Sequence, residues 1–124
     1  MRRLLVLSLT AAALVAVAAV PALANHDKGG TNSYTLGEKV TKLTKKQALE
    51  MLVEDLSRRV NADLGKAKNA KCTMKKRSAT CSYKASNPLG AALGVDSAFC
   101  VKNGKLKITS GGKGANVTQT AKDC

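Results

Sequence analysis

The stretch KCTMKKRSATCSYK at residues 71–84 constrains the fold most, because its pattern predicts a β-hairpin with a cysteine on each arm. Side chains of a strand alternate between its two faces. With the turn centred between Lys76 and Arg77, one face is apolar and carries both cysteines, and the other carries lysines and hydroxyl groups. The facing apolar pairs are Cys72 and Cys81, Met74 and Ala79, and Ala70 and Tyr83; the polar face comprises Lys71, Thr73, Lys75, Ser78, Thr80, Ser82 and Lys84. This alternation is typical of an antiparallel sheet with one face on a core and the other in water.

The cysteines indicate both a pairing and a compartment. Four cysteines allow three pairings, and the hairpin register favours Cys72–Cys81, which leaves Cys100–Cys124. With one Phe, two Tyr and no Trp, the chain has few large side chains for a core. Small domains in oxidising compartments commonly rely on disulfides for support. We therefore expect two structural disulfides, each contributing about 2–4 kcal/mol.

The first 24 residues have the features of a secretory signal peptide. Arg2 and Arg3 precede an apolar run over residues 4–20, and the small-x-small site Ala22-Leu23-Ala24 follows. The alternative is a membrane anchor, for which the run is short, since a spanning helix needs about 20 residues. We expect cleavage after Ala24 and a secreted or extracytoplasmic protein, with an alanine-rich signal of bacterial type. Removing 24 of the 124 residues leaves 100, the size of one small domain.

The chain after the signal divides into a leader and a domain. Residues 25–43 are polar and predict a flexible leader, with one possible edge strand over Ser33–Leu36. Residues 44–124 form the predicted domain, which begins with a helix capped by Thr44 and Gln47 and stopped at Gly65. Apolar residues at steps of three and four form one buried stripe: Leu49, Leu52, Val53, Leu56, Val60 and Leu64.

Two acid–arginine pairs are expected on the helix surface. Glu54–Arg58 and Asp55–Arg59 have the i,i+4 spacing of exposed ion pairs, which contribute about 0.2–0.5 kcal/mol each.

A second hairpin is predicted over residues 99–108, because Asn103-Gly104 is the strongest short turn signal. Phe99 then faces Ile108 and Val101 faces Leu106, while Cys100, Lys102, Lys105 and Lys107 point to the polar side. Residues 110–114 predict a flexible turn, and Ala115–Thr120 a last strand. The expected fold is α+β: one long amphipathic helix packed on a three- to five-stranded antiparallel sheet with two disulfides. A helix followed by a cysteine-bearing antiparallel sheet is similar to cystatin-like architecture, an analogy of fold that implies no function.

The connection at residues 87–98 is unusually apolar. Asn87 can cap and Pro88 can start a short helical turn over Leu89–Leu93, with Gly94 as a stop. One interpretation is a loop that covers the end of the core. The other is an exposed partner-binding loop, whose apolar contacts would be Leu89, Leu93 and Val95.

Basic residues are concentrated in the second part of the chain. The net charge is +13, or +11 once Arg2 and Arg3 are removed with the signal. Residues 65–124 hold twelve Lys and Arg against two acids, whereas residues 25–64 hold seven against six. Such an excess attracts anionic partners, although it also describes a solvated surface. The candidate anion-binding residues are Lys71, Lys75, Lys76, Arg77, Lys84, Lys102, Lys105 and Lys107.

Residues that would carry catalysis are scarce. The one histidine, His26, lies in the leader, and no GxSxG motif occurs. We expect no enzyme, no metal and no cofactor. Few aromatic residues are present to stack on bases, so sequence-specific nucleic-acid recognition is not expected. The sequence therefore predicts a monomeric, non-catalytic basic protein that binds an anionic surface or polymer, such as lipid head groups or a cell-wall polymer. The alternative is a protein-binding or inhibitor module that acts through the 87–98 loop.

Overall fold

The computed structural model describes residues 29–95 and 97–124. The predicted signal peptide, its cleavage site and His26 lie outside these residues. The elements follow in the order β1 (Gly29–Thr35), α2 (Lys45–Val60), β2 (Ala67–Lys75), β3 (Ser78–Ser86), α3 (Pro88–Ala92), β4 (Ala98–Ile108), η3 (Ser110–Gly112) and β5 (Gly114–Asp123).

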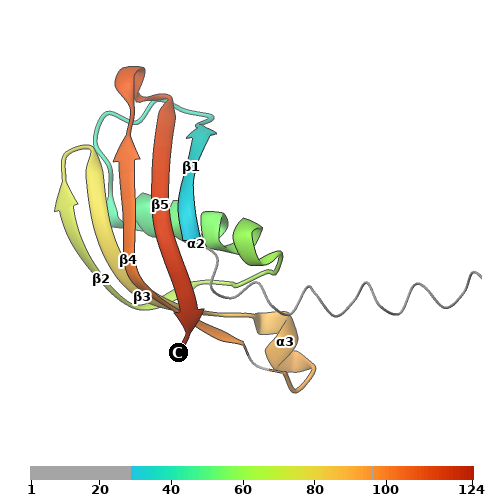
Figure 1. Ribbon diagram of the computed structural model, residues 1–124. Coiled ribbons are helices and arrows are strands. Elements are labelled where there is room, and N and C mark those ends of the chain that lie inside the picture. The colour runs from blue at the N-terminus through green and yellow to red at the C-terminus, as the bar shows by residue number, and fades with distance from the viewer. Residues whose placement is uncertain (1–28, 96) are drawn as a thin grey trace, which may run out of the picture.

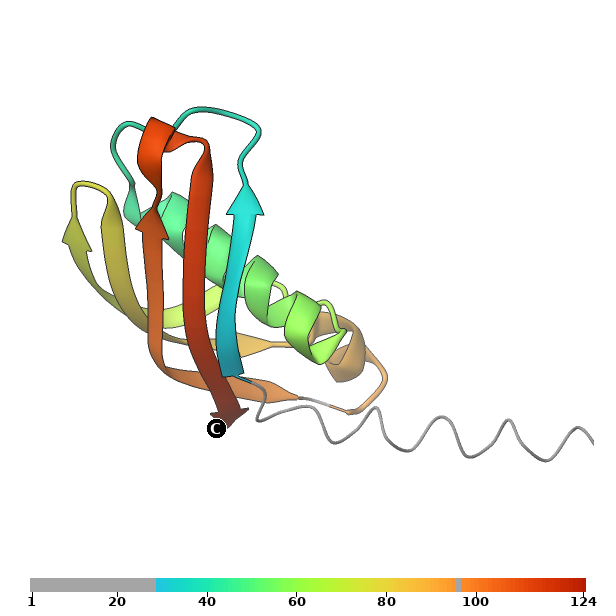
Figure 2. The same ribbon diagram turned by 45° about the horizontal axis from the view of Figure 1, so that its top comes forward.

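The five strands form one antiparallel sheet in the order β1-β5-β4-β3-β2. Helix α2 crosses one face of the sheet, and α3 extends from one end of it (Figures 1 and 2). The predicted α+β architecture is therefore confirmed, with a strand number at the upper end of the predicted range. Below, the sheet face that packs on α2 is the inner face and the opposite one is the outer face.

The β2–β3 hairpin has the predicted register, with Cys72 opposite Cys81 and Met74 opposite Ala79. The two cysteines form a disulfide with their Cα atoms 4.1 Å apart. The register departs from the prediction at Ala70, because it shifts between Lys68 and Lys71. Asn69, which lies at this β-bulge, has a φ of 51°, within the left-handed region. Strand β2 therefore begins earlier than the predicted hairpin, and its outward-facing positions change from Lys68 before the bulge to Lys71, Thr73 and Lys75 after it.

The predicted second hairpin is wrong, because residues 98–108 form the single strand β4. A two-residue hairpin turn of this kind needs positive φ at both central residues, and neither Asn103 nor Gly104 has it. Instead, the pairing of β4 with both neighbours shifts by one residue near positions 102–104. This bulge lets Phe99 and Val101 before it, and Leu106 and Ile108 after it, face the same core.

Helix α2 begins as predicted and ends earlier than predicted. The capping box of Thr44 and Gln47 is present. The helix stops at Val60 rather than before Gly65, because Asn61 takes up a left-handed conformation at φ 53° and caps it. Leu64 is nevertheless fully buried beyond the helix end. The predicted stripe packs on the inner face, where Leu52, Leu56 and Leu64 are each 0% exposed.

The segment predicted as a leader contributes the edge strand β1, which pairs with β5 from Gly29↔Thr120 to Thr35↔Gly114. It is longer than the predicted Ser33–Leu36 and begins earlier. Leu36, Val40 and Leu43 then donate backbone hydrogen bonds to Lys113, Gly112 and Lys76 in the sheet turns. Residues 29–43 are thus tied to the folded domain.

The second disulfide joins Cys100 on β4 to Cys124, as predicted, with a Cα–Cα distance of 4.9 Å. It fixes the end of β5 beside the start of β4. Two disulfides in a domain of this size are typical of an oxidising, extracytoplasmic environment.

Candidate anion-binding face

The outer face of the sheet is a continuous surface of lysines, hydroxyl groups and amides. We call it the lysine–hydroxyl face. Its side chains alternate along the strands with the buried residues of the inner face. They are Thr31 and Ser33 on β1, Lys68, Lys71, Thr73 and Lys75 on β2, Ser78, Thr80, Ser82 and Lys84 on β3, Lys102, Lys105 and Lys107 on β4, and Asn116, Thr118, Thr120 and Lys122 on β5.

Strand pairing arranges these side chains in rows across the sheet. The central row runs Thr73, Thr80, Lys105, Thr118 and Thr31. The next row runs Lys75, Ser78, Lys107, Asn116 and Ser33. Since neighbouring strands lie about 4.8 Å apart, each lysine is flanked by a hydroxyl or amide at that spacing. Such rows offer an anion lysine cations with hydrogen-bonding side chains beside them.

Two shallow depressions lie on this face at the bulge in β4. One of about 270 Å³ is bordered by Lys71, Thr73, Thr80, Ser82, Lys102 and Asn103. A second of about 520 Å³ is bordered by Cys100, Lys102, Asn103, Thr120, Lys122 and Asp123. Both share the bulged residues Lys102 and Asn103. The predicted candidates Lys71 and Lys102 are thereby brought to the same depression, although they come from different strands.

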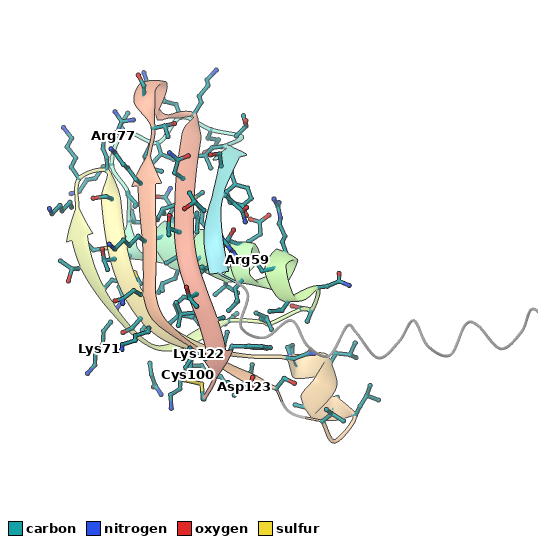
Figure 3. The ribbon with its side chains drawn as sticks, viewed as in Figure 1. Arg59, Lys71, Arg77, Cys100, Lys122 and Asp123 are labelled. Carbon is teal, nitrogen blue, oxygen red and sulfur yellow. A yellow bond between two sulfur atoms is a disulfide. The ribbon has the colours of Figure 1, made fainter. Side chains whose placement is uncertain are left out.

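Six of the eight predicted anion-binding residues lie on this face, and the other two lie at the β2–β3 turn. Lys76 is exposed there. Arg77 is only partly exposed, because its guanidinium donates a 2.5 Å hydrogen bond to the Thr109 carbonyl. Its backbone carbonyl also accepts from Ile108. Arg77 therefore ties two turns together (labelled at the upper end in Figure 3), and it is a less available anion ligand than predicted.

Sequence reasoning missed Lys68 and Lys122. Lys68 is opposite Lys84, Lys84 is opposite Cys100, and Cys100 is opposite Lys122, so these residues form one row at the end of the sheet that carries α3. Figure 3 shows Cys100 and Lys122 at this end. The alternation of faces would have found Lys122 had the predicted last strand continued beyond Thr120. It would have placed Lys68 on the inner face with Ala70 and Cys72, because only the bulge between Lys68 and Lys71 turns Lys68 to the outer face.

Acidic residues are separated from this face. Apart from Asp123, those that the structure describes lie on α2 or in the connections flanking it: Glu38, Glu50, Glu54, Asp55 and Asp63. The lysines of the outer face therefore have no neighbouring carboxylates along most of the described sheet. This separation leaves one face of the molecule strongly positive.

A larger hollow, of about 750 Å³, lies elsewhere, between α2 and the start of β2. Its apolar floor includes Leu49, Val53 and Ala67, and its rim carries both signs of charge. Lys46 and Glu50 on this rim pair at 3.8 Å. A rim of mixed sign does not select an anion, so we do not assign the candidate site to this hollow.

Asp55 departs from its predicted place on the helix surface. It is 0% exposed, and its carboxylate accepts from Arg59 at 2.6 Å, from Asn32 at 2.7 Å, from Gln119 and from the Tyr34 hydroxyl. The expected surface ion pair is thus the centre of a buried polar network. Its neighbour Glu54–Arg58 remains exposed, as predicted.

The network sets the ionisation of its members. Burial alone would raise the pKa of Asp55, but the hydrogen bonds, from Arg59 first, outweigh it and hold that pKa below its ordinary value. Burial, followed by the Asp55 carboxylate, raises the pKa of Tyr34. Burial likewise raises the pKa of Tyr83, whose hydroxyl lies 3.0 Å from the Leu52 carbonyl and from the Gln119 amide oxygen. Asp55 is therefore a structural anion, paired inside the protein.

The 87–98 connection contains the predicted short helix, which spans Pro88–Ala92 with Asn87 as its N-cap. The interpretation as a cover for the core is wrong for its large side chains. Leu89, Leu93 and Val95 are 65%, 75% and 65% exposed, and they are the exposed large apolar residues of the described chain. The exposure of these three side chains agrees with the other interpretation, that of an exposed loop.

No family model, curated protein or solved structure matches this chain. Within residues 29–95 and 97–124, no group of three or more His, Cys, Asp or Glu side chains could hold a metal ion. None of the helices in these ranges is long and apolar enough to cross a membrane.

Proposed function

We propose that this is an exported, non-catalytic basic protein that binds an anionic polymer or surface through its lysine–hydroxyl face. One observation carries the proposal: lysines from four adjacent strands share the outer face, while the described acids other than Asp123 lie with α2. A protein that needs charge only for solubility is served equally well by mixed signs. Segregation costs folding energy through repulsion between like charges, and an anionic partner relieves it.

The chemistry of the face favours a partner that presents repeated anionic groups. Lysine binds phosphate or carboxylate as a point charge, and threonine and serine hydroxyls add hydrogen bonds without fixing one geometry. Lys105 and Lys107 are two residues apart on β4, which corresponds to about 7 Å. A flat array of this kind suits a polyanion or a charged surface better than one small ligand.

Export supports the same proposal. The first 24 residues match a signal peptide in sequence, and both disulfides are consistent with an oxidising destination. Anionic polymers and lipid head groups are the partners that a cationic protein meets outside the cytoplasm.

The test compares two variants with the same net charge. In the first, Lys75, Lys84, Lys105 and Lys107 are replaced by Gln; in the second, Lys39, Lys42, Lys45 and Lys46, which lie outside the sheet, are replaced by Gln. Retention of the chain from Asn25 on immobilised polyphosphate is measured over a salt series. We expect retention of the parent to weaken steeply with salt, and the first variant to bind more weakly with a flatter salt dependence. The second variant should stay close to the parent. Equal losses in both variants would show that only net charge matters and would contradict the proposed face.

A second candidate function is a protein-binding or inhibitor module. The exposed Leu89, Leu93 and Val95 favour it. An apolar contact loosens little with salt, so such a complex would persist where charge-driven retention is lost.

A further inference from the structure

We infer that the anionic surface is a phospholipid bilayer, and that the 87–95 segment inserts into it while the neighbouring lysines bind the head groups. This inference rests on the proposed function and adds the identity of the partner. It starts from two features that meet at one end of the sheet: an exposed apolar segment and a row of lysines.

The apolar segment is built to present its side chains. Leu89, Leu93 and Val95 are largely exposed, and residues 87–95 contain no charged side chain. The base of the segment is fixed, because Asn87 donates a backbone hydrogen bond to Ser97 at 3.1 Å. Three exposed aliphatic side chains on one short segment form a patch of the kind that marks an interaction site.

The backbone of this segment is prepared for an apolar environment. The amides of Leu89 and Gly90 donate to the Asn87 side chain. The amides of Ala91, Leu93, Gly94 and Val95 donate to carbonyls within the segment. Unpaired backbone N–H and C=O groups raise the free energy of placing an irregular segment in lipid. These six amides are therefore already satisfied before insertion.

The cations lie where head groups would be. Lys84 precedes Ser86 by two residues on β3, and Ser86 is opposite Ala98 at the base of the segment. Lys68 and Lys122 belong to the same row as Lys84. Along a strand, two residues correspond to about 7 Å, so these ammonium groups can reach the interface when the leucines enter it. Figure 3 shows Lys122 near the end of β5, at the same end of the sheet as α3.

Lipid fits this segment better than a protein surface does. Hot spots of protein interfaces are rich in Trp, Tyr and Arg and combine apolar contact with directed hydrogen bonds. Residues 87–95 contain none of these residue types. Exposed aliphatic side chains near a row of lysines match the two requirements of peripheral membrane binding, which are buried apolar area and attraction to anionic lipid.

The test uses tryptophan as a reporter, since the chain contains none. Leu93→Trp places the probe on the apolar segment, and Ser110→Trp places a control at the opposite end of β4. Both variants of the chain from Asn25 are mixed with phosphatidylglycerol vesicles and with phosphatidylcholine vesicles. We expect a blue shift of Leu93→Trp emission with phosphatidylglycerol and no shift of Ser110→Trp.

Substitutions then separate insertion from charge. Replacing Leu89, Leu93 and Val95 by Ser should lower partition to phosphatidylglycerol vesicles about tenfold or more while leaving retention on polyphosphate and thermal stability unchanged. Replacing Lys68, Lys84 and Lys122 by Gln should weaken vesicle binding more than replacing Lys75, Lys105 and Lys107.

Three outcomes would overturn the inference. If Leu93→Trp shows no shift while polyphosphate still retains the parent, insertion is wrong and the proposed function stands. If neither polyphosphate nor vesicles bind the parent, both are wrong. If the Ser variant loses a protein partner and keeps its vesicle binding, the segment belongs to a protein interface.

Discussion

Asp55 occupies a different environment in the structure from the one that its sequence spacing predicts. Its i,i+4 spacing to Arg59 is the same as that of Glu54 to Arg58, and sequence spacing treats the two pairs alike. The structure separates them: the Asp55 and Arg59 side chains are 0% and 8% exposed, and those of Glu54 and Arg58 are 61% and 57% exposed. The difference arises from β1 and β5, which bring Asn32, Tyr34 and Gln119 to the Asp55 carboxylate.

The two pairs give a matched prediction. Asp55→Asn leaves Arg59 nearly buried without its counter-charge and should lower the free energy of unfolding by about 3 kcal/mol or more. Glu54→Gln should lower it by less than about 1 kcal/mol. Urea denaturation at neutral pH measures both. Similar losses would mean that Asp55 is not the buried centre of the network.

The effect of Asp55→Asn should also depend on pH. Because the folded pKa of Asp55 is lowered, its ionisation stabilises the fold above its unfolded pKa of about 3.9, and this contribution is lost as the pH falls through the folded pKa. The stability difference between the parent and Asp55→Asn should therefore shrink in acid. A stability difference that keeps its neutral-pH value throughout the acid range below about pH 3.9 would contradict the assignment.

Among the elements, β4 shows where local signals mislead. The apolar residues of β4 stand at odd-numbered positions up to Val101 and at even-numbered positions from Leu106 onward. Either a hairpin turn or a bulge between them brings all of these side chains to one face. The Asn103-Gly104 pair favoured the turn on local chemistry. The structure uses the glycine differently: a Cβ at position 104 would lie 3.2 Å from Leu52 Cδ2, so Gly104 allows α2 to approach the sheet closely. That requirement comes from tertiary packing and is not visible in the sequence of β4 alone.

This packing predicts coupling between Gly104 and Leu52. Gly104→Val should lower the free energy of unfolding by about 1–3 kcal/mol through overpacking, whereas Gly37→Val, where a Cβ would meet nothing within 4 Å, should change it little. In a Leu52→Ala background the loss from Gly104→Val should be smaller, since the shortened side chain leaves room. Strictly additive losses in denaturation experiments would place Gly104 away from the helix.

Over the whole molecule, features fixed by short-range patterns were predictable. The capping box at Thr44, the register of Cys72 with Cys81 and the remaining cysteine pair follow from local spacing or elimination, and they are confirmed. The polar alternation likewise identified most lysines of the outer face. What required the fold was long-range: the pairing of β1 with β5, the burial of Asp55 and the row of Lys68, Lys84 and Lys122. These depend on strand order, which a single sequence does not specify.

The central claim is that the lysine–hydroxyl face, rather than net charge, binds the anionic partner. Threonine methyl groups provide the most direct measurement, because Thr73, Thr80 and Thr118 lie in the central row of that face, while Thr41 and Thr44 are exposed outside the sheet. In methyl NMR spectra of the chain from Asn25 titrated with polyphosphate, we predict that the first three signals shift in a saturable way and the last two stay in place. Shifts confined to Thr41 and Thr44, or equal shifts of all five signals, would contradict the claim.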